Sequence, residues 1–266
     1  MNEFQESLNI KAIGLVHTPE RYRYEAPRQG VFANNEGYIE LVPGNNFETA
    51  LCELEGFERI WVIFKFHLNS GWNPKVSPPV ISPPGRRVGV FASRSPHRPN
   101  PLGISAVELV GVERLRIYIR NFDMLDGTPV FDIKPYIPRA DAFPEARCGW
   151  VEQAVGSEYE LCFSAQFSAQ NDMILAVAGL DLANFCSVQL ANDPLSAERK
   201  RLTELADGVF EIACRTWRIR FWVDSTDKTV HIMSVRSGYA PEDLAPAAPD
   251  PYGDKQLHRE FIGLFC

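Results

Sequence analysis

The residues best suited to binding and chemistry are concentrated in one short segment, Ser93–Gly103. It contains two arginines, two serines, one histidine and one asparagine, together with three prolines and a final glycine. Proline restricts the backbone φ angle, whereas Gly103 allows a tight bend. A loop that is stiff before a ligand arrives loses little conformational entropy on binding. The segment therefore predicts a binding loop; the alternative is a solvated, proline-rich connection whose arginines form surface ion pairs.

The cysteines and histidines are not spaced as metal ligands. The six cysteines are scattered singly, and the five histidines form neither H-E-x-x-H nor H-x-H. We therefore expect no zinc site and no catalytic metal, and we expect small buried thiols instead. A hydrolase using Ser93 or Ser95 with His97 is also disfavoured, because neither serine lies in a G-x-S-x-G turn. Demanding chemistry is then expected to come from an organic cofactor.

In the first half of the chain, short β segments must position the loop Ser93–Gly103. Seven runs rich in Val, Ile, Phe and Tyr are predicted strands: Lys11–Thr18, Gly37–Val42, Phe57–Phe66, Val88–Ser93, Ser105–Val112, Leu115–Phe122 and Thr128–Tyr136. Their spacing is typical of a barrel or sandwich. One helix is predicted between Asn45 or Asn46, which can cap it, and Gly56. The chain lacks βα alternation and any G-x-G-x-x-G motif, so a doubly wound nucleotide-binding fold is not expected.

A second unit is predicted to begin near residue 158. Its expected elements are a strand at Tyr159–Phe167, a helical stretch at Asn171–Leu190 broken near Gly179, and strands at Val209–Cys214, Trp217–Val223 and Thr229–Val235. This pattern indicates a small α+β domain over 158–237. Residues 238–266 form a Pro/Ala-rich tether that ends in an amphipathic piece around Leu257–Phe265. That piece could be a dimer clasp, a partner-binding helix or a packed tail.

Composition excludes some classes of protein. The chain has 266 residues, and its formal net charge of −7 rules out a uniformly basic surface but leaves room for a local basic face. Its hydrophobic content of 45% and charged content of 23% are those of an ordinary globular protein. No apolar run reaches the roughly 18 residues of a membrane helix, and the first residues lack a secretion-signal pattern. We expect a cytoplasmic protein without a membrane partner.

Four separated blocks, in this order, resemble the signature of the TsaA/TrmO family. They are Ala26-Pro27-Arg28-Gln29, Phe66-His67 with Gly71-Trp72-Asn73-Pro74, the run Ser93–Gly103, and Leu125–Tyr136. The resemblance spans about residues 10–150 and extends loosely to Asn192-Asp193-Pro194 with Arg199-Lys200. It implies an S-adenosylmethionine-dependent tRNA methyltransferase that modifies N6 of threonylcarbamoyladenosine at tRNA position 37, next to the anticodon. It also implies a mainly β fold: a single-sheet β-barrel catalytic domain (1–157) that forms a homodimer, followed by the α+β domain and an extended tail.

The resemblance implies a set of cofactor-binding residues: Pro27, Arg28, Gln29, His67, Leu68, Arg94, Ile104, Leu125, Asp126, Gly127 and Thr128. Guanidinium groups such as those of Arg28 and Arg94 suit the cofactor carboxylate, and Leu68 with Ile104 would line an apolar adenine pocket. The alternatives are surface ion pairs or tRNA phosphate contacts for the arginines, core packing for the apolar side chains, and a simple hairpin turn for Asp126-Gly127.

The acceptor nitrogen of the resembled reaction is a poor nucleophile, because its lone pair is delocalised. Removing its proton would raise its reactivity. The candidate catalytic residues are Asp126, Asp132 and His67, with Tyr136 as a group that could position the acceptor. The sequence does not rank them.

Nucleic acid would have to approach an acidic chain. Between Arg86 and Arg120 there are seven arginines against Glu108 and Glu113, so 7 − 2 = +5. The candidate nucleic-acid contacts are Arg86, Arg87, Arg98, Arg199, Lys200 and Arg218; an ordinary solvated face is the alternative. Trp72 and Phe91 could stack on a base or be packed in the core. The rival functions are a non-catalytic RNA-binding module and a methyltransferase acting on another acceptor.

Overall fold

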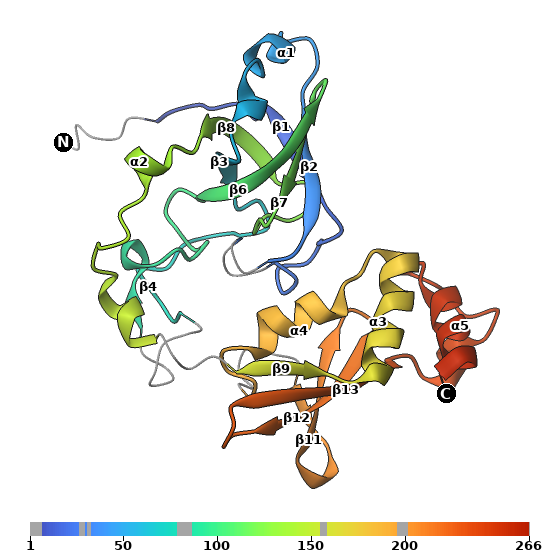
Figure 1. Ribbon diagram of the computed structural model, residues 1–266. Coiled ribbons are helices and arrows are strands. Elements are labelled where there is room, and N and C mark those ends of the chain that lie inside the picture. The colour runs from blue at the N-terminus through green and yellow to red at the C-terminus, as the bar shows by residue number, and fades with distance from the viewer. Residues whose placement is uncertain are drawn as a thin grey trace. The chain divides into compact units, whose positions relative to one another are not determined.

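The computed structural model divides the chain into two compact units, residues 1–148 and 149–266 (Figure 1). It describes residues 7–26, 30, 33–78, 87–154, 159–195 and 202–265. The first unit holds the four sequence blocks, and the second holds the predicted α+β domain and the tail.

Six strands of the first unit close into one antiparallel barrel in the order β1-β2-β7-β6-β3-β8. Their bounds are β1 (Gly14–His17), β2 (Glu36–Leu41), β3 (Arg59–Lys65), β6 (Leu102–Glu113), β7 (Arg116–Arg120) and β8 (Pro129–Pro135). The predicted mainly β fold with a single-sheet barrel is therefore confirmed. Closure leaves no open sheet edge in the barrel, which stabilises such a small sheet.

The barrel core follows from alternation along the strands. In β3, Ile60, Val62 and Phe64 are buried, whereas the residues between them are partly exposed. Alternate side chains of a strand point to opposite faces, so this pattern places one apolar row inside the barrel. Phe122 and Met124, which follow β7, are also buried in this core.

The remaining elements of the first unit are short. They are the hairpin of β4 (Lys75–Val76) and β5 (Val88–Gly89), and the helices α1 (Phe47–Ala50) and α2 (Pro138–Asp141). The predicted strand Val88–Ser93 is wrong beyond Gly89, because Val90–Ala92 form a 3-10 turn. The predicted helix after Asn46 stops early: Glu53 has a φ of 66°, and a separate 3-10 turn, Leu54–Gly56, follows.

The second unit is a five-stranded sheet in the order β10-β11-β12-β13-β9. Its elements are β9 (Glu160–Phe163), α3 (Ala165–Ala178), α4 (Leu182–Leu190), β10 (Leu202–Glu204), β11 (Val209–Cys214), β12 (Trp217–Asp224), β13 (Thr229–Ser237) and α5 (Lys255–Phe265). β9 is an edge strand that pairs with β13 in parallel, whereas the other pairs are antiparallel. Helix α3 contacts β13 of this sheet, and α5 contacts both α3 and β13.

Two local signals decide the helices of the second unit. The predicted strand Tyr159–Phe167 is too long, because Ser164 caps α3 by accepting a hydrogen bond from the Phe167 amide at 3.0 Å. The break predicted near Gly179 is confirmed: Gly179 ends α3 in a left-handed conformation with a φ of 64°. Within the described ranges no single helix could span a membrane; α3 and α4 meet the length and composition criteria only as a pair, bent by 115°.

The terminal segment is a packed tail. Helix α5 contacts α3 and β13, and it buries Leu257, His258 and Phe261. Of the three roles left open by the sequence, the structure supports the packed tail, since the apolar side of α5 is already covered by its own unit.

Candidate active site

The connections that carry the sequence blocks lie at one end of the barrel. Neighbouring strands are all antiparallel, so β1, β3 and β7 end where β2, β6 and β8 begin. The connections at that end are residues 18–35, 66–101 and 121–128, which we call the motif rim. The described parts of the blocks therefore meet at the motif rim, although they are far apart in the sequence: Phe66–Pro74, Ser93–Pro101 and Leu125–Thr128. Of the first block, the structure describes only Ala26.

A tight turn at Leu125–Thr128 presents Asp126. The Thr128 amide donates to the Leu125 carbonyl at 3.1 Å, and the Leu125 amide donates to the Thr128 hydroxyl at 3.2 Å. Gly127 adopts a φ of 72°, which glycine allows without strain. Its amide donates to the carbonyl of Val16 in β1 at 2.8 Å. This tight turn is not the hairpin turn that was the alternative for Asp126-Gly127, because β7 and β8, which it separates along the chain, do not pair with each other. It presents the Asp126 carboxylate at the motif rim.

His67 contacts this turn from the end of β3. Its Nδ1 lies 3.2 Å from Oγ1 of Thr128, in hydrogen-bonding contact. Partial burial lowers the pKa of His67, the charge of Lys65 lowers it further, and Asp126 acts in the opposite direction. The predicted residues His67, Asp126, Gly127 and Thr128 are thus brought together.

The Asp126 carboxylate has partners from the connection after β1. Its Oδ1 accepts a hydrogen bond from the Thr18 amide at 3.2 Å. Nδ1 of His17 lies 3.9 Å from the same oxygen, while Nε2 of His17 lies 3.4 Å from Glu40. Asp126 still exposes 38% of its side chain, so it remains open to a ligand. His17 was not identified from the sequence; a lone histidine at the end of a strand carries no motif.

A second carboxylate lies in the same connection as Asp126. Asp123 accepts a hydrogen bond from the Ser105 hydroxyl of β6. Burial raises the pKa of Asp123, whereas the hydrogen bond and the nearby charge of Arg94 lower it. The predicted residue Arg94 therefore faces a carboxylate of its own chain. The sequence reading missed Asp123, although its position two residues before Leu125 was an available signal.

The proline-rich loop is held by its own hydrogen bonds. The Ser93 hydroxyl donates to the Val90 carbonyl at 2.9 Å, and the Arg98 guanidinium donates to the carbonyls of Ser93 and Val90 at 2.8 and 3.2 Å. The guanidinium of Arg98 also lies 5.9 Å from the centre of the Phe91 ring. One side of Arg98 is thus engaged within the loop, and its predicted phosphate contact stays a prediction.

One buried polar atom of this loop is unsatisfied. Nδ1 of His97 is buried and has no hydrogen-bond partner among the residues that the structure describes. Buried polar atoms are almost always paired, so such an atom marks a place where a further group fits.

Two predicted catalytic residues lie away from the motif rim. Tyr136 follows β8 at the opposite end of the barrel, where its amide donates to the Arg59 carbonyl and its ring lies 5.3 Å from that of Trp61. A seven-residue strand spans roughly 20 Å. The expectation that Tyr136 joins Asp126 and His67 is therefore not met within one chain. Asp132, in the middle of β8, pairs instead with Lys134 at 2.8 Å.

The predicted apolar residues divide into two groups. Leu125 is buried, at 8% exposure, and belongs to the interior of the rim. Leu68 and Ile104 are 44% and 58% exposed, so within one chain they form an open surface rather than an enclosed pocket. Phe91 and Trp72, the candidate stacking residues, are also exposed, which argues against core packing.

Several predicted residues cannot be placed. Pro27, Arg28, Gln29, Arg86, Arg199 and Lys200 lie outside the described residues. Of the other predicted phosphate contacts, Arg87 donates to the Lys75 carbonyl at 2.6 Å, and Arg218 donates to the carbonyls of Arg215 and Trp217.

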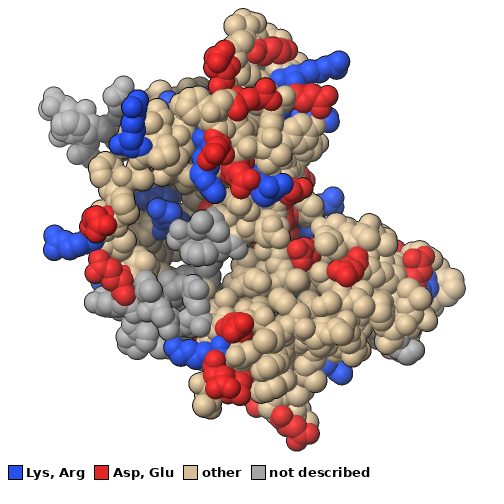
Figure 2. All heavy atoms as spheres, viewed as in Figure 1, with Lys and Arg blue, Asp and Glu red and all other residues tan. Residues whose placement is uncertain are grey.

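The positive count between Arg86 and Arg120 overstates the local charge. Arg116 pairs with Glu40 at 3.0 Å, and Arg120 pairs with Glu36 and Glu108 at 2.7 and 3.3 Å. Acidic residues of the neighbouring strand β2, which were not counted, neutralise these two arginines. On the visible face, positive and negative side chains are accordingly interspersed (Figure 2).

Comparison with known proteins agrees with this arrangement. A family model described as the tRNA-methyltransferase O N-terminal domain matches residues 15–142, the barrel and its rim. A tRNA (adenine(37)-N6)-methyltransferase of Escherichia coli is 36% identical over 201 residues, which cover 73% of this chain and 85% of that protein. The chain belongs to the TrmO family.

Further proteins are similar to this chain in sequence and in structure. A probable S-adenosyl-L-methionine-binding protein of Pyrococcus abyssi is 39% identical over 146 residues, covering 54% of this chain and 77% of that protein. The crystal structure of TrmO from Pseudomonas aeruginosa superposes with a TM-score of 0.64 at 27% identity, covering 87% of this chain and 99% of that one. The TrmO likeness therefore includes both units of the chain.

Proposed function

We propose that this protein is an S-adenosylmethionine-dependent tRNA methyltransferase that methylates N6 of adenosine 37, and that it acts in the cytoplasm. The observation that carries the proposal is the meeting of the described parts of three distant sequence blocks at the motif rim of a TrmO-type barrel. A TrmO relative that is 36% identical is named for this reaction. We assign catalysis to the barrel unit, because the blocks lie there.

The residues at the motif rim fit the proposed cofactor. S-adenosylmethionine combines an apolar purine face with a carboxylate, an ammonium and a ribose diol, and when bound it supplies an electrophilic methyl group on a sulfonium. The rim offers an exposed apolar side chain at Leu68, an accessible carboxylate at Asp126 and the unsatisfied Nδ1 of His97. The start of β6 adds the exposed apolar side chain of Ile104. A site that is mostly apolar with a few polar groups is typical for such ligands.

The geometry favours two of the four candidate catalytic residues for removing the proton of the acceptor nitrogen. Asp126 lies in the turn that His67 contacts through Thr128. Tyr136 and Asp132 contact other groups instead. A lowered pKa keeps the His67 ring neutral near pH 7, and a neutral imidazole can accept a proton. We therefore propose that Asp126 orients the reactants and that His67, held by Thr128, is the candidate base.

We further propose threonylcarbamoyladenosine as the acceptor. One experiment tests both this acceptor assignment and the methyltransferase function. Purified protein is incubated with S-adenosylmethionine and either tRNA carrying this nucleoside or an unmodified transcript, and the nucleosides are analysed by mass spectrometry. We expect the methylated product from the modified tRNA only. Product from both tRNAs would reject the acceptor assignment, and product from neither would reject the function in favour of an RNA-binding module.

Asp126→Asn tests the site itself. Loss of a group that orients reactants costs on the order of 100-fold in rate, and we expect kcat/KM to fall by about that factor. Asp172→Asn, an exposed carboxylate on α3, is the matched control and should keep wild-type activity. Equal activity of both variants would remove the motif rim as the active site.

We also propose that two chains form a homodimer through the outer face of β6. Leu102 and Ile104 project from this strand with 41% and 58% exposure. Apolar residues in a row on a strand surface are typical of an interface rather than of a free surface. Light scattering is expected to give a dimer for the wild type and a monomer for Ile104→Glu; a monomeric wild type would contradict the proposal.

A further inference from the structure

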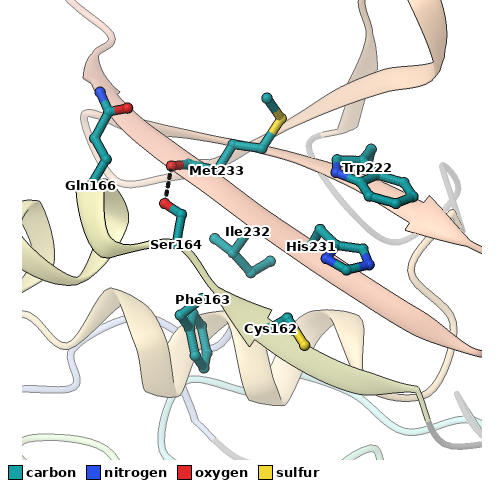
Figure 3. Close-up of a pocket in the computed structure, with 8 residues that line it drawn as sticks. All are labelled: Cys162, Phe163, Ser164, Gln166, Trp222, His231, Ile232 and Met233. Atoms are coloured by element: carbon teal, nitrogen blue, oxygen red, sulfur yellow. Dashed lines mark hydrogen bonds between the residues drawn. The ribbon is translucent and has the colours of Figure 1, made fainter.

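A shallow hollow lies in the second unit where the start of α3 meets the exposed side chains of β12 and β13. Its volume is about 410 Å³, within the range of small-ligand sites. The side chains that shape it come from β9, the start of α3, β12 and β13: Cys162, Ser164, Gln166, Trp222, His231 and Met233 (Figure 3). None of the four family blocks contributes to it.

The wall of the hollow is a pair of stacked rings. Trp222 and His231 are direct partners in the register of β12 and β13, and their ring centres lie 4.0 Å apart with an interplanar angle of 8°. Trp222 is 38% exposed. Side chains directly opposite on antiparallel strands support each other, so the rings are held upright on the sheet. A flat π surface of this kind can stack with a planar ligand.

A β-bulge and the hydrogen bonds of Ser164 shape the floor and rim of the hollow. The register of β13 shifts between Arg220 and Phe221 of its partner strand, which leaves Met233 as the extra residue of a β-bulge. The Ser164 hydroxyl donates to the Met233 carbonyl at 2.5 Å, and the Ser164 amide donates to the Ile232 carbonyl at 3.0 Å. Bulges redirect side chains and often lie next to binding sites. Here the bulge places the Met233 thioether on the rim (Figure 3).

The same sheet face carries guanidinium groups beyond the rings. Arg220 and Arg236 both pair with Glu211, with shortest distances of 3.5 and 2.6 Å, and expose 45% and 44% of their side chains. These two guanidinium groups share one carboxylate, so the three side chains together carry a net charge of +1. Asp224 and Glu160 lie at the other end, next to Thr229 in the register. The face is therefore cationic on one side of the hollow and acidic on the other.

We infer that this hollow binds an unpaired base of tRNA, with a neighbouring phosphate on Arg220 and Arg236; this inference rests on the proposed function. Aromatic rings beside a cationic groove are the combination that binds single-stranded nucleic acid, since every base has a face that can stack. The Gln166 carboxamide at the rim can both donate and accept hydrogen bonds, as a base edge requires. The second unit thereby contributes to substrate binding and not to methyl transfer.

The test measures tRNA binding by the full chain with fluorescently labelled tRNA. Loss of base stacking weakens binding by about tenfold per base, so the double variant Trp222→Ala/His231→Ala is expected to raise Kd by about that factor. Trp222→Phe should restore most of the affinity, because it keeps an aromatic face. Tyr252→Ala, an exposed aromatic residue of the same unit at 66% exposure, is the matched control and should bind as the wild type does.

A second readout locates the contact directly. Crosslinking of tRNA that carries 4-thiouridine, followed by mass spectrometry, is expected to label the peptides of β12 and β13. The KM for S-adenosylmethionine should not change in any of these variants. The inference is overturned if the double variant binds tRNA with wild-type affinity, or if the crosslinks are confined to other peptides.

Failure of this inference differs from failure of the proposed function. If the wild type methylates tRNA but the double variant binds it normally, only the stacking site is wrong. If the wild type binds tRNA through Trp222 but transfers no methyl group, the function is wrong and the stacking site remains. Competition by free adenosine monophosphate as strong as by tRNA would identify a mononucleotide site and would also reject the inference.

Discussion

Single residues determine how closely the motif rim is joined to the barrel core. Gly103 ends the proline-rich loop within β6, opposite Phe64 of β3. A Cβ at Gly103 would lie 2.4 Å from Cζ of the Phe64 ring, which is only 2% exposed. The glycine is therefore needed for close approach and not only for a bend, a reason that the sequence did not provide.

Gly103→Ala should consequently destabilise the protein. Overpacking a core costs about 1–3 kcal/mol, and urea denaturation should show a decrease of that size in the free energy of unfolding. Gly111→Ala, on the same strand, is the control, because no atom lies within 4 Å of its added Cβ. A substitution at Gly103 that is as neutral as the one at Gly111 would mean that Phe64 moves away without cost.

At the scale of elements, helix α5 stabilises the second unit through a small buried cluster. Phe261 is fully buried, and its ring centre lies 4.9 Å from that of Trp217 in β12. His258 stacks on the same Trp217 ring at 3.7 Å and contacts the hydroxyls of Ser237 and Thr216 at 2.8 and 2.9 Å. The helix is thus attached by both apolar packing and hydrogen bonds.

Phe261→Ala tests the apolar part of this attachment. Removing a buried phenylalanine costs about 3–5 kcal/mol, so the free energy of unfolding of the second unit should fall by that amount. Leu264→Ala, on the exposed side of α5 at 70% exposure, should change it by less than about 0.5 kcal/mol. Similar effects of both substitutions would show that α5 does not pack as described.

The polar part of the attachment predicts a pH dependence. Burial lowers the pKa of His258 to about 4, although Asp254 acts in the opposite direction. In the unfolded chain the pKa is about 6.5, so the unfolded state takes up the proton first as the pH falls. Stability should therefore be lost between about pH 6.5 and 4, with no further loss from this group below pH 4. A His258 NMR titration with a midpoint near 6.5 in the folded protein would contradict this account.

At the scale of the whole molecule, a net charge of −7 opposes the approach of tRNA. Binding must then depend on local guanidinium groups that release counterions from the phosphates. Arg116 is paired with Glu40 and flanked by the Tyr38 ring at 4.9 Å, so it has little charge to offer. The effective cations are fewer than the sequence count suggests.

The affinity for tRNA should fall steeply as salt rises. A fit of log Kd against log salt concentration is expected to become shallower by about one unit in Arg220→Gln, as for the loss of one phosphate contact. Arg116→Gln should leave the slope unchanged, because this arginine is neutralised within the barrel. A flat salt response in the wild type would exclude a phosphate-contact surface.

The helices and strands were predicted correctly where neighbouring residues in the sequence decide the local structure. Alternating apolar residues placed β2, β3, β6, β7 and β8 to within a few residues, and Gly179 marked the end of α3. The predictions failed where a hydrogen bond across the chain decides the end of an element. Val88–Ser93 is a predicted strand with a strand-like composition, yet only Val88 and Gly89 find a partner strand, in β4. The end of β9 has a local cause instead, because Ser164 caps α3 through the Phe167 amide.

The sequence by itself determined the fold class, the family and the blocks that carry the candidate site, because strand alternation and local motifs are encoded within a few neighbouring residues. Only the tertiary structure decided which of these residues meet. It brought His67 to Thr128, joined Ser105 to Asp123, sent Tyr136 to the opposite end of the barrel, and stacked Trp222 on His231. Each of these depends on the register between strands that are distant in the chain, and a shift of one residue would turn every side chain to the other face.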